Sequence, residues 1–134
     1  MSVGLLIITH EGIGGALLRT ATHTLKSCPI NAVVLEVPQD NRLESHQLRA
    51  RRLLDQVDQG DGVLILTDLY GATPGNIASA LHDGRRVITV TGINLPMVMR
   101  VLNYSSLPLE ELAEKAIGGG KDCIFACDQE SGCG

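Results

Sequence analysis

The chain has 134 residues, a length typical of one domain, and a formal net charge of −4 at pH 7 that provides no basic surface for nucleic acid. Hydrophobic residues make up 44% of it, but one Phe and two Tyr are the only aromatic residues, so the core must consist of Leu, Ile, Val and Ala. No apolar run approaches the roughly 18 to 20 residues that cross a bilayer, and no basic segment precedes the N-terminal apolar run; we therefore expect a cytoplasmic protein without direct membrane insertion.

The first half of the chain alternates apolar runs with helical patterns. Residues 3–8 form a continuous apolar run typical of a strand that is buried on both faces. The glycine-rich segment 10–15 follows, and apolar residues with helical spacing then predict a helix that ends at Cys28. Residues 32–37 are predicted to form a second strand, and residues 43–57 an amphipathic helix.

The second half continues the alternation. The predicted elements are a strand at 63–67, a helix from Thr73-Pro74 to about His82, a strand at 86–91, helices at 96–102 and 108–117, and a last strand at 121–126. Strands that alternate with helices favour a doubly wound α/β fold, in which a mostly parallel sheet has helices on both faces. Ligands of such sheets bind at the carboxyl ends of the strands.

Three of the four cysteines lie within the last twelve residues, at positions 123, 127 and 133. In a cytoplasmic chain we expect reduced thiols. Their spacing, C-x3-C-x5-C, has no nearby histidine and does not match the usual zinc-ligand spacings, so we predict no metal site. The sequence thus predicts one domain at residues 1–126 and a flexible, cysteine-containing tail at 127–134.

His10, at the end of the first predicted strand, is the strongest candidate for a catalytic residue. A neutral imidazole has one nucleophilic nitrogen, which can accept a phosphoryl group when a neighbour fixes the tautomer. Asp68, at the end of the third predicted strand, is the candidate neighbour, provided that these strands are adjacent, as in the order 2-1-3-4. We predict that His10 and Asp68 form a catalytic pair, and that His23, His46 and His82 lie at the surface or its boundary.

Two helix starts offer places for a phosphate group. Gly12 and Gly14 would allow backbone amides to approach an anion at the start of the first helix. Thr73 would cap a later helix and donate its hydroxyl to the same anion. We predict that Gly12, Gly14 and Thr73 are phosphate-binding residues, that amides and hydroxyls replace side-chain cations, and that no cofactor is needed.

Three motifs at three strand ends resemble the mannose-family IIA component of the bacterial phosphoenolpyruvate-dependent sugar phosphotransferase system. They are IITH at 7–10, TDLYGATPGN at 67–76 and GINLPM at 92–97. The resemblance covers residues 2 to 126 and implies that His10 accepts a phosphoryl group from the phosphocarrier HPr and passes it to a IIB component. It also implies that Asp68 pairs with His10, that Thr73 replaces a serine in contact with the phosphoryl group, and that the protein is a homodimer in which the strand 121–126 is exchanged.

Two positions depart from the family's pattern. Glu11 replaces a glycine that often follows the histidine, and Ala72 replaces a second glycine. Some stand-alone relatives serve regulation instead of transport. A regulatory protein whose signal is the phosphorylation state of His10 is therefore an alternative to a transport carrier.

A dinucleotide-binding protein is a further alternative. The G-x-G at residues 12–14 follows the first predicted strand, and Glu36 stands near the end of the second. Leu17, however, occupies a position at which the dinucleotide fingerprint needs a small residue. The pattern therefore favours the phosphoryl carrier.

Overall fold

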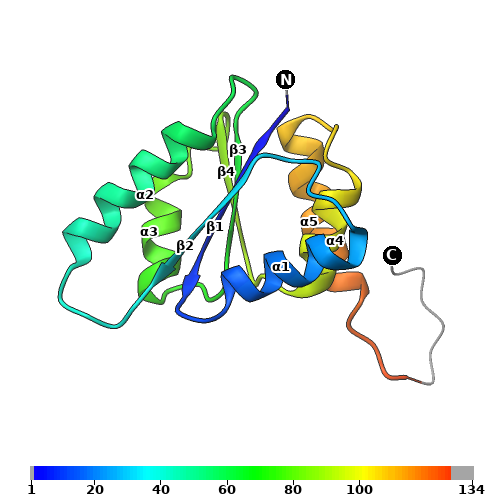
Figure 1. Ribbon diagram of the computed structural model, residues 1–134, viewed down its shortest axis with the longest axis horizontal. Helices are drawn as coiled ribbons and strands as arrows, with labels where there is room; N and C mark the ends of the chain where they lie inside the picture. The colour runs from blue at the N-terminus through cyan, green and yellow to red at the C-terminus, as the bar shows by residue number, and fades with distance from the viewer. Residues whose placement is uncertain (1, 128–134) are drawn as a thin grey trace.

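The computed structural model describes residues 2–127, which form a four-stranded parallel sheet between two layers of helices (Figure 1). The strands are β1 (Gly4–His10), β2 (Ala32–Val37), β3 (Val63–Thr67) and β4 (Val87–Thr91). Their order is β2-β1-β3-β4, and each neighbouring pair is parallel. The predicted doubly wound sheet is confirmed, and β1 lies next to β3, as the pairing of His10 with Asp68 requires.

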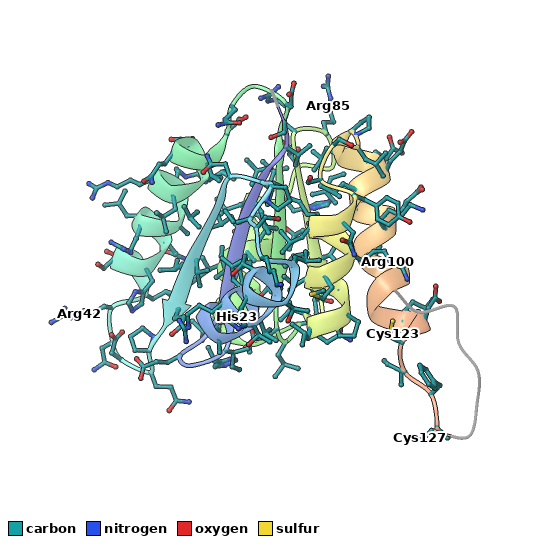
Figure 2. The ribbon with its side chains drawn as sticks, turned by 45° about the vertical axis from the view of Figure 1, so that its right-hand side comes forward. His23, Arg42, Arg85, Arg100, Cys123 and Cys127 are labelled. Atoms are coloured by element: carbon teal, nitrogen blue, oxygen red, sulfur yellow. The ribbon has the colours of Figure 1, made fainter. Side chains whose placement is uncertain are left out.

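Five helices cover the two faces of the sheet. They are α1 (Gly14–Leu25), α2 (Leu43–Val57), α3 (Thr73–Leu81), α4 (Leu95–Asn103) and α5 (Leu109–Asp122). Helices α2 and α3 lie on one face, and α1, α4 and α5 on the other (Figure 1). Side chains fill the space between the sheet and both layers (Figure 2).

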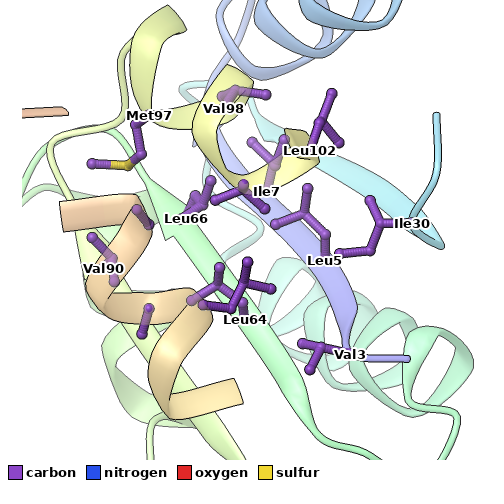
Figure 3. Packing of buried hydrophobic residues seen from close by; sticks show 14 of the residues in the cluster. Val3, Leu5, Ile7, Ile30, Leu64, Leu66, Val90, Met97, Val98 and Leu102 are labelled. Atoms are coloured by element: carbon purple, nitrogen blue, oxygen red, sulfur yellow. The ribbon is translucent and has the colours of Figure 1, made fainter. Parts of the chain in front are cut away.

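The central strands are apolar on both faces because each face is covered by helices. In β1, Leu5 and Ile7 pack toward α1 and α4, whereas Leu6 and Ile8 pack toward α2 and α3. All four side chains are 0% exposed. Figure 3 shows the first of these two cores, in which Leu5 and Ile7 lie near residues of α4. Burial of each such side chain contributes about 1.5 to 3 kcal/mol relative to an exposed position.

The strand predicted at 121–126 is absent from the described chain, because Lys121 and Asp122 complete α5 and residues 124–126 have no regular structure. Helix α5 continues past 117 because its glycines allow close packing on α4. A β-carbon on Gly119 would lie 2.6 Å from Cβ of Arg100, and one on Gly120 would lie 2.9 Å from Cε of Met97. The glycines therefore serve helix packing and do not end the helix.

The cysteines differ in part from the prediction of reduced thiols. Cys123 is disulfide-bonded, whereas Cys28 and Cys127 are free and exposed. The predicted flexible tail at 127–134 lies almost entirely outside the described residues, so the division at position 126 stays a prediction. Among residues 2–127, no helix has the length and hydropathy needed to cross a membrane.

Candidate functional site

The parallel pairing of β1 with β3 brings His10 and Asp68 together at the carboxyl edge of the sheet. The Nδ1 atom of His10 lies 2.7 Å from Oδ2 of Asp68, and the same oxygen accepts the backbone amide of His10 at 3.0 Å. The other carboxylate oxygen accepts the amide of Leu69 at 3.0 Å. These contacts hold Asp68 firmly, and its side chain is only 10% exposed.

The protonation state of this pair follows from the environment of Asp68. Burial raises the pKa of the Asp68 carboxyl, but hydrogen bonds from the backbone amide and ring of His10 outweigh burial and lower the pKa overall. An ionised carboxylate only accepts hydrogen bonds, so Nδ1 of His10 must donate to it. In the neutral ring this leaves Nε2 unprotonated, with a lone pair available to a phosphorus atom.

The His10 ring lines a cavity of about 660 Å³ between α2 and α3. The wall consists of His10, Val37 at the end of β2, the loop residues 38–41, Leu43 and His46 of α2, and Thr73 and Pro74 of α3. The His10 side chain is 34% exposed, so the ring is accessible from outside the protein. Among the described residues that line it, none is Lys or Arg.

Thr73 lies in this cavity wall, but it is not the helix cap that the sequence predicted, and its phosphate-binding role stays a prediction. Ala72 is the N-cap residue of α3, without a side-chain capping bond, and Thr73 is the first helical residue. No acceptor in the described part of the chain binds the backbone amide of Thr73. Both its amide and its hydroxyl therefore remain available at a helix N-terminus, which favours an anion.

Gly75 fixes how α3 begins beside the Asp68 loop. A β-carbon at this position would lie 2.3 Å from the carbonyl oxygen of Leu69, well inside contact distance. Only glycine allows this approach of the helix to the loop backbone. The loop residue Gly71 has φ of +88°, a conformation that also favours glycine.

The glycines after His10 face a different environment. The amides of Gly12 and Gly15 donate to the two carboxylate oxygens of Glu36, at 3.0 and 2.8 Å, and the amide of Gly14 donates to Oγ1 of Thr9 at 2.8 Å. Neither Gly12 nor Gly14 lines the cavity. They would bind a phosphoryl group only after Glu36 and Thr9 released them, so the predicted phosphate-binding role stays a prediction.

Glu36 therefore acts as the anion at the start of α1. The hydrogen bonds from Gly12 and Gly15 are the main reason that the pKa of Glu36 is lowered, and Arg19 adds a smaller effect. A dinucleotide would need the amides at this turn for its pyrophosphate. Because Glu36 already binds them, the geometry argues against the dinucleotide alternative.

A second histidine in the cavity wall was missed by the sequence reasoning. His46 of α2 is 14% exposed, and its Nε2 lies 2.9 Å from Oδ1 of Asp40. The boundary position that its amphipathic helix predicted is confirmed, but that pattern gave no indication of the cavity. The one indication in the sequence was that an acidic residue, Asp40, precedes His46 by six positions and lies just before the predicted helix.

The other two histidines lie outside this cavity. His23 is exposed on α1 (Figure 2), and His82 is exposed, with its Nδ1 accepting the backbone amide of Thr89 at 2.9 Å. The surface predictions for His23 and His82 are confirmed. Within residues 2–127, no group of three or more His, Cys, Asp or Glu side chains is arranged to hold a metal ion.

Comparisons with known proteins match this architecture. Residues 4–117 match the family EIIA-man, described as "PTS system fructose IIA component". Over 129 residues the chain is 28% identical to the PTS system mannose-specific EIIAB component of Escherichia coli K12. The matched region covers 94% of this chain and 40% of that protein. The chain thus spans less than half the length of this relative.

Solved structures share the fold. The mannose/sorbose-specific IIA subunit of the phosphotransferase system from Enterococcus faecalis superimposes with a TM-score of 0.83, at 20% identity and over 98% of each chain. The PTS IIA protein associated with the fucose utilization operon of Streptococcus pneumoniae gives a TM-score of 0.77 at 23% identity, over 96% of this chain and 98% of that one.

Proposed function

The chain belongs to the EIIA-man family of phosphotransferase-system IIA components, and from this membership we propose that it is a phosphoryl carrier that is phosphorylated on Nε2 of His10. The observation that supports this most strongly is the hydrogen bond of 2.7 Å between Nδ1 of His10 and Asp68. It leaves Nε2 as the nucleophile, on a side chain that is 34% exposed and lines the cavity.

The transfer step is a displacement at phosphorus. The Nε2 lone pair forms a bond to the phosphorus as the bond between phosphorus and the donor's histidine nitrogen breaks. The donor ring leaves as neutral imidazole when its second nitrogen carries a proton, and the His10 ring becomes a phosphoimidazolium that keeps its proton on Nδ1. The negative charge of Asp68 stabilises that cation, and onward transfer reverses the step.

Thr73 is the proposed contact for the phosphoryl oxygens. Its amide and hydroxyl stand at the N-terminus of α3, in the same cavity wall as His10. Phosphoryl transfer depends mainly on positioning and on electrostatic stabilisation of the equatorial oxygens. The backbone dipoles at this helix start supply part of that stabilisation.

The proposed partners are proteins in the cytoplasm. HPr would donate the phosphoryl group and a IIB component would accept it, and the chain itself would form a homodimer. Leu69 and Tyr70, which directly follow Asp68, are 60% and 77% exposed. Apolar and aromatic side chains in such a position favour a protein contact beside the reacting histidine.

The test is a labelling and chase experiment. The protein is incubated with phosphoenolpyruvate, enzyme I and HPr, and acid-labile label is measured before and after addition of IIB proteins. We expect label on His10 and its loss to a IIB protein. Label that stays on the protein while the binding of another partner changes would indicate the regulatory alternative, and no label at all would contradict the proposal.

A further inference from the structure

A second histidine–carboxylate pair, formed by His46 and Asp40, shares the cavity with His10. Nε2 of His46 lies 2.9 Å from Oδ1 of Asp40, and both residues line the same cavity of about 660 Å³ as His10 and Thr73. His46 lies in the first turns of α2 and Asp40 in the loop before it. The cavity thus has His10, whose ring is bound to Asp68, on its sheet side and the pair of His46 and Asp40 on its α2 side.

Asp40 orients the ring of His46. The pKa of Asp40 is lowered, first by a hydrogen bond from the backbone amide of Arg42 and then by the ring of His46. An ionised carboxylate accepts hydrogen bonds, so Nε2 of His46 donates to it. Nδ1 is then the nitrogen that changes its role: it accepts a hydrogen bond in the neutral ring and donates one when the ring is protonated.

A phosphoryl group on His10 would bring a charge of about −1.5 to −2 into this cavity, by analogy with other phosphorylated side chains. Among the described residues that line the cavity, the titratable ones are His10, Asp40 and His46, and α3 contributes only Thr73 and Pro74. The side chain of Arg42 extends away from the body of the protein (Figure 2). In that state His10 itself carries the phosphoryl group and Asp40 is an acid, so His46 is the remaining group in the described wall that can add positive charge.

We propose that His46 takes up a proton when His10 is phosphorylated, and that its Nδ1–H then donates a hydrogen bond to a phosphoryl oxygen. This inference rests on the proposed phosphorylation of His10. The proton comes from solvent and returns there when the phosphoryl group leaves, while Asp40 keeps the ring in place. His46 is therefore a phosphoryl-binding residue whose charge follows the loading of His10.

The direct test follows the histidine rings of the wild-type protein by NMR at pH 7.5, before and after phosphorylation by phosphoenolpyruvate, enzyme I and HPr. We expect the carbon-bound ring protons of His46 to move toward the shifts of a protonated imidazole, while those of His23 stay in place. A purely structural pair would keep its shifts. If His10 is labelled and the His46 signals do not move, this inference is wrong and the proposed function stands.

A variant pair tests the consequence. His46→Gln keeps a donor for Asp40 but cannot gain a charge, and His23→Gln is the matched control on α1, outside the cavity. We expect His46→Gln to remain labelled on His10, with the equilibrium against phospho-HPr shifted about 3- to 10-fold toward HPr, and His23→Gln to match the wild type. An unshifted equilibrium in a folded His46→Gln protein would overturn the inference, and absence of label from the wild type would instead overturn the proposed function.

Discussion

One carboxylate oxygen of Asp68, Oδ2, accepts two hydrogen bonds from a single residue, His10: one from the ring Nδ1 at 2.7 Å and one from the backbone amide at 3.0 Å. The two bonds fix the ring relative to its own backbone, so the free Nε2 has a defined direction toward the cavity. Asp68 thereby selects the tautomer of the His10 ring and fixes its orientation, and under the proposed function it would supply the charge that a phosphorylated ring needs.

The change Asp68→Asn is expected to slow phosphorylation of His10 by on the order of 10- to 100-fold, because the neutral amide can still orient the ring but cannot stabilise the phosphoimidazolium. The initial rate of labelling by phospho-HPr measures this effect, and a melting curve checks that the variant folds. A rate equal to that of the wild type would show that the charge of Asp68 is not used.

Two threonines that are both 0% exposed in neighbouring strands provide a matched pair. Oγ1 of Thr9 accepts the amide of Gly14 and donates to the carbonyl of His10, each at 2.8 Å, whereas Oγ1 of Thr67 has no hydrogen-bond partner among the described residues. We expect Thr9→Val to lower the free energy of unfolding by about 1 to 3 kcal/mol. Thr67→Val should leave it unchanged or raise it by about 1 kcal/mol, since it removes an unsatisfied hydroxyl. Urea denaturation measures both, and a larger loss for Thr67→Val would contradict this account.

Glu36 makes stability depend on pH through the amides at the start of α1. The pKa of Glu36 is lower in the folded protein than in the unfolded chain, where it is about 4.3 to 4.5. Its ionised carboxylate therefore contributes to the free energy of unfolding above that value, and the contribution is lost as the pH falls through the pKa of the folded state. We expect Glu36→Gln to cost about 1 kcal/mol at pH 7. Denaturation of both proteins at several pH values should show this difference shrinking below pH 4.5. A difference that grows toward acid would contradict the assignment.

Adjacent glycines in α5 test the contact of this helix with α4. A β-carbon on Gly118 meets nothing closer than 3.8 Å, whereas one on Gly119 would lie 2.6 Å from Cβ of Arg100. Gly118→Ala is therefore expected to stabilise the protein by about 0.5 to 1 kcal/mol through helix propensity. Gly119→Ala should destabilise it by about 1 to 3 kcal/mol through overpacking. Chemical denaturation measures both changes, and stabilisation by Gly119→Ala would show that the helices are not in close contact.

Much of the fold could be predicted from the sequence, because its buried strands are short apolar runs with clear ends. The strands at 32–37 and 63–67 and the helix at 43–57 agree residue by residue with the structure. The C-terminal strand at 121–126 was wrong for the described chain, because local pattern does not show that the glycines of α5 face another helix. That information comes only from the packing of α4 on α5.

The candidate site was predictable to a similar degree. His10 ends β1 and Asp68 follows β3, so the sequence predicted that they meet on the condition that these strands are neighbours, and the order β2-β1-β3-β4 fulfils that condition. The contacts of Glu36 and the cavity position of His46 could not be expected. A side chain that binds an amide far along the chain, or that lines a cavity, produces no periodic pattern in the sequence. Glu36 lies 24 residues from the amide of Gly12 that it accepts, and only the fold brings them together.

The central claim is that His10 is the phosphorylated residue. The most direct measurement is acid-labile labelling by phosphoenolpyruvate, enzyme I and HPr in the wild type, in His10→Ala and in His23→Ala, with melting curves to confirm that all three are folded. We predict label on the wild type and on His23→Ala, and none on His10→Ala. Full labelling of a folded His10→Ala protein would contradict the account.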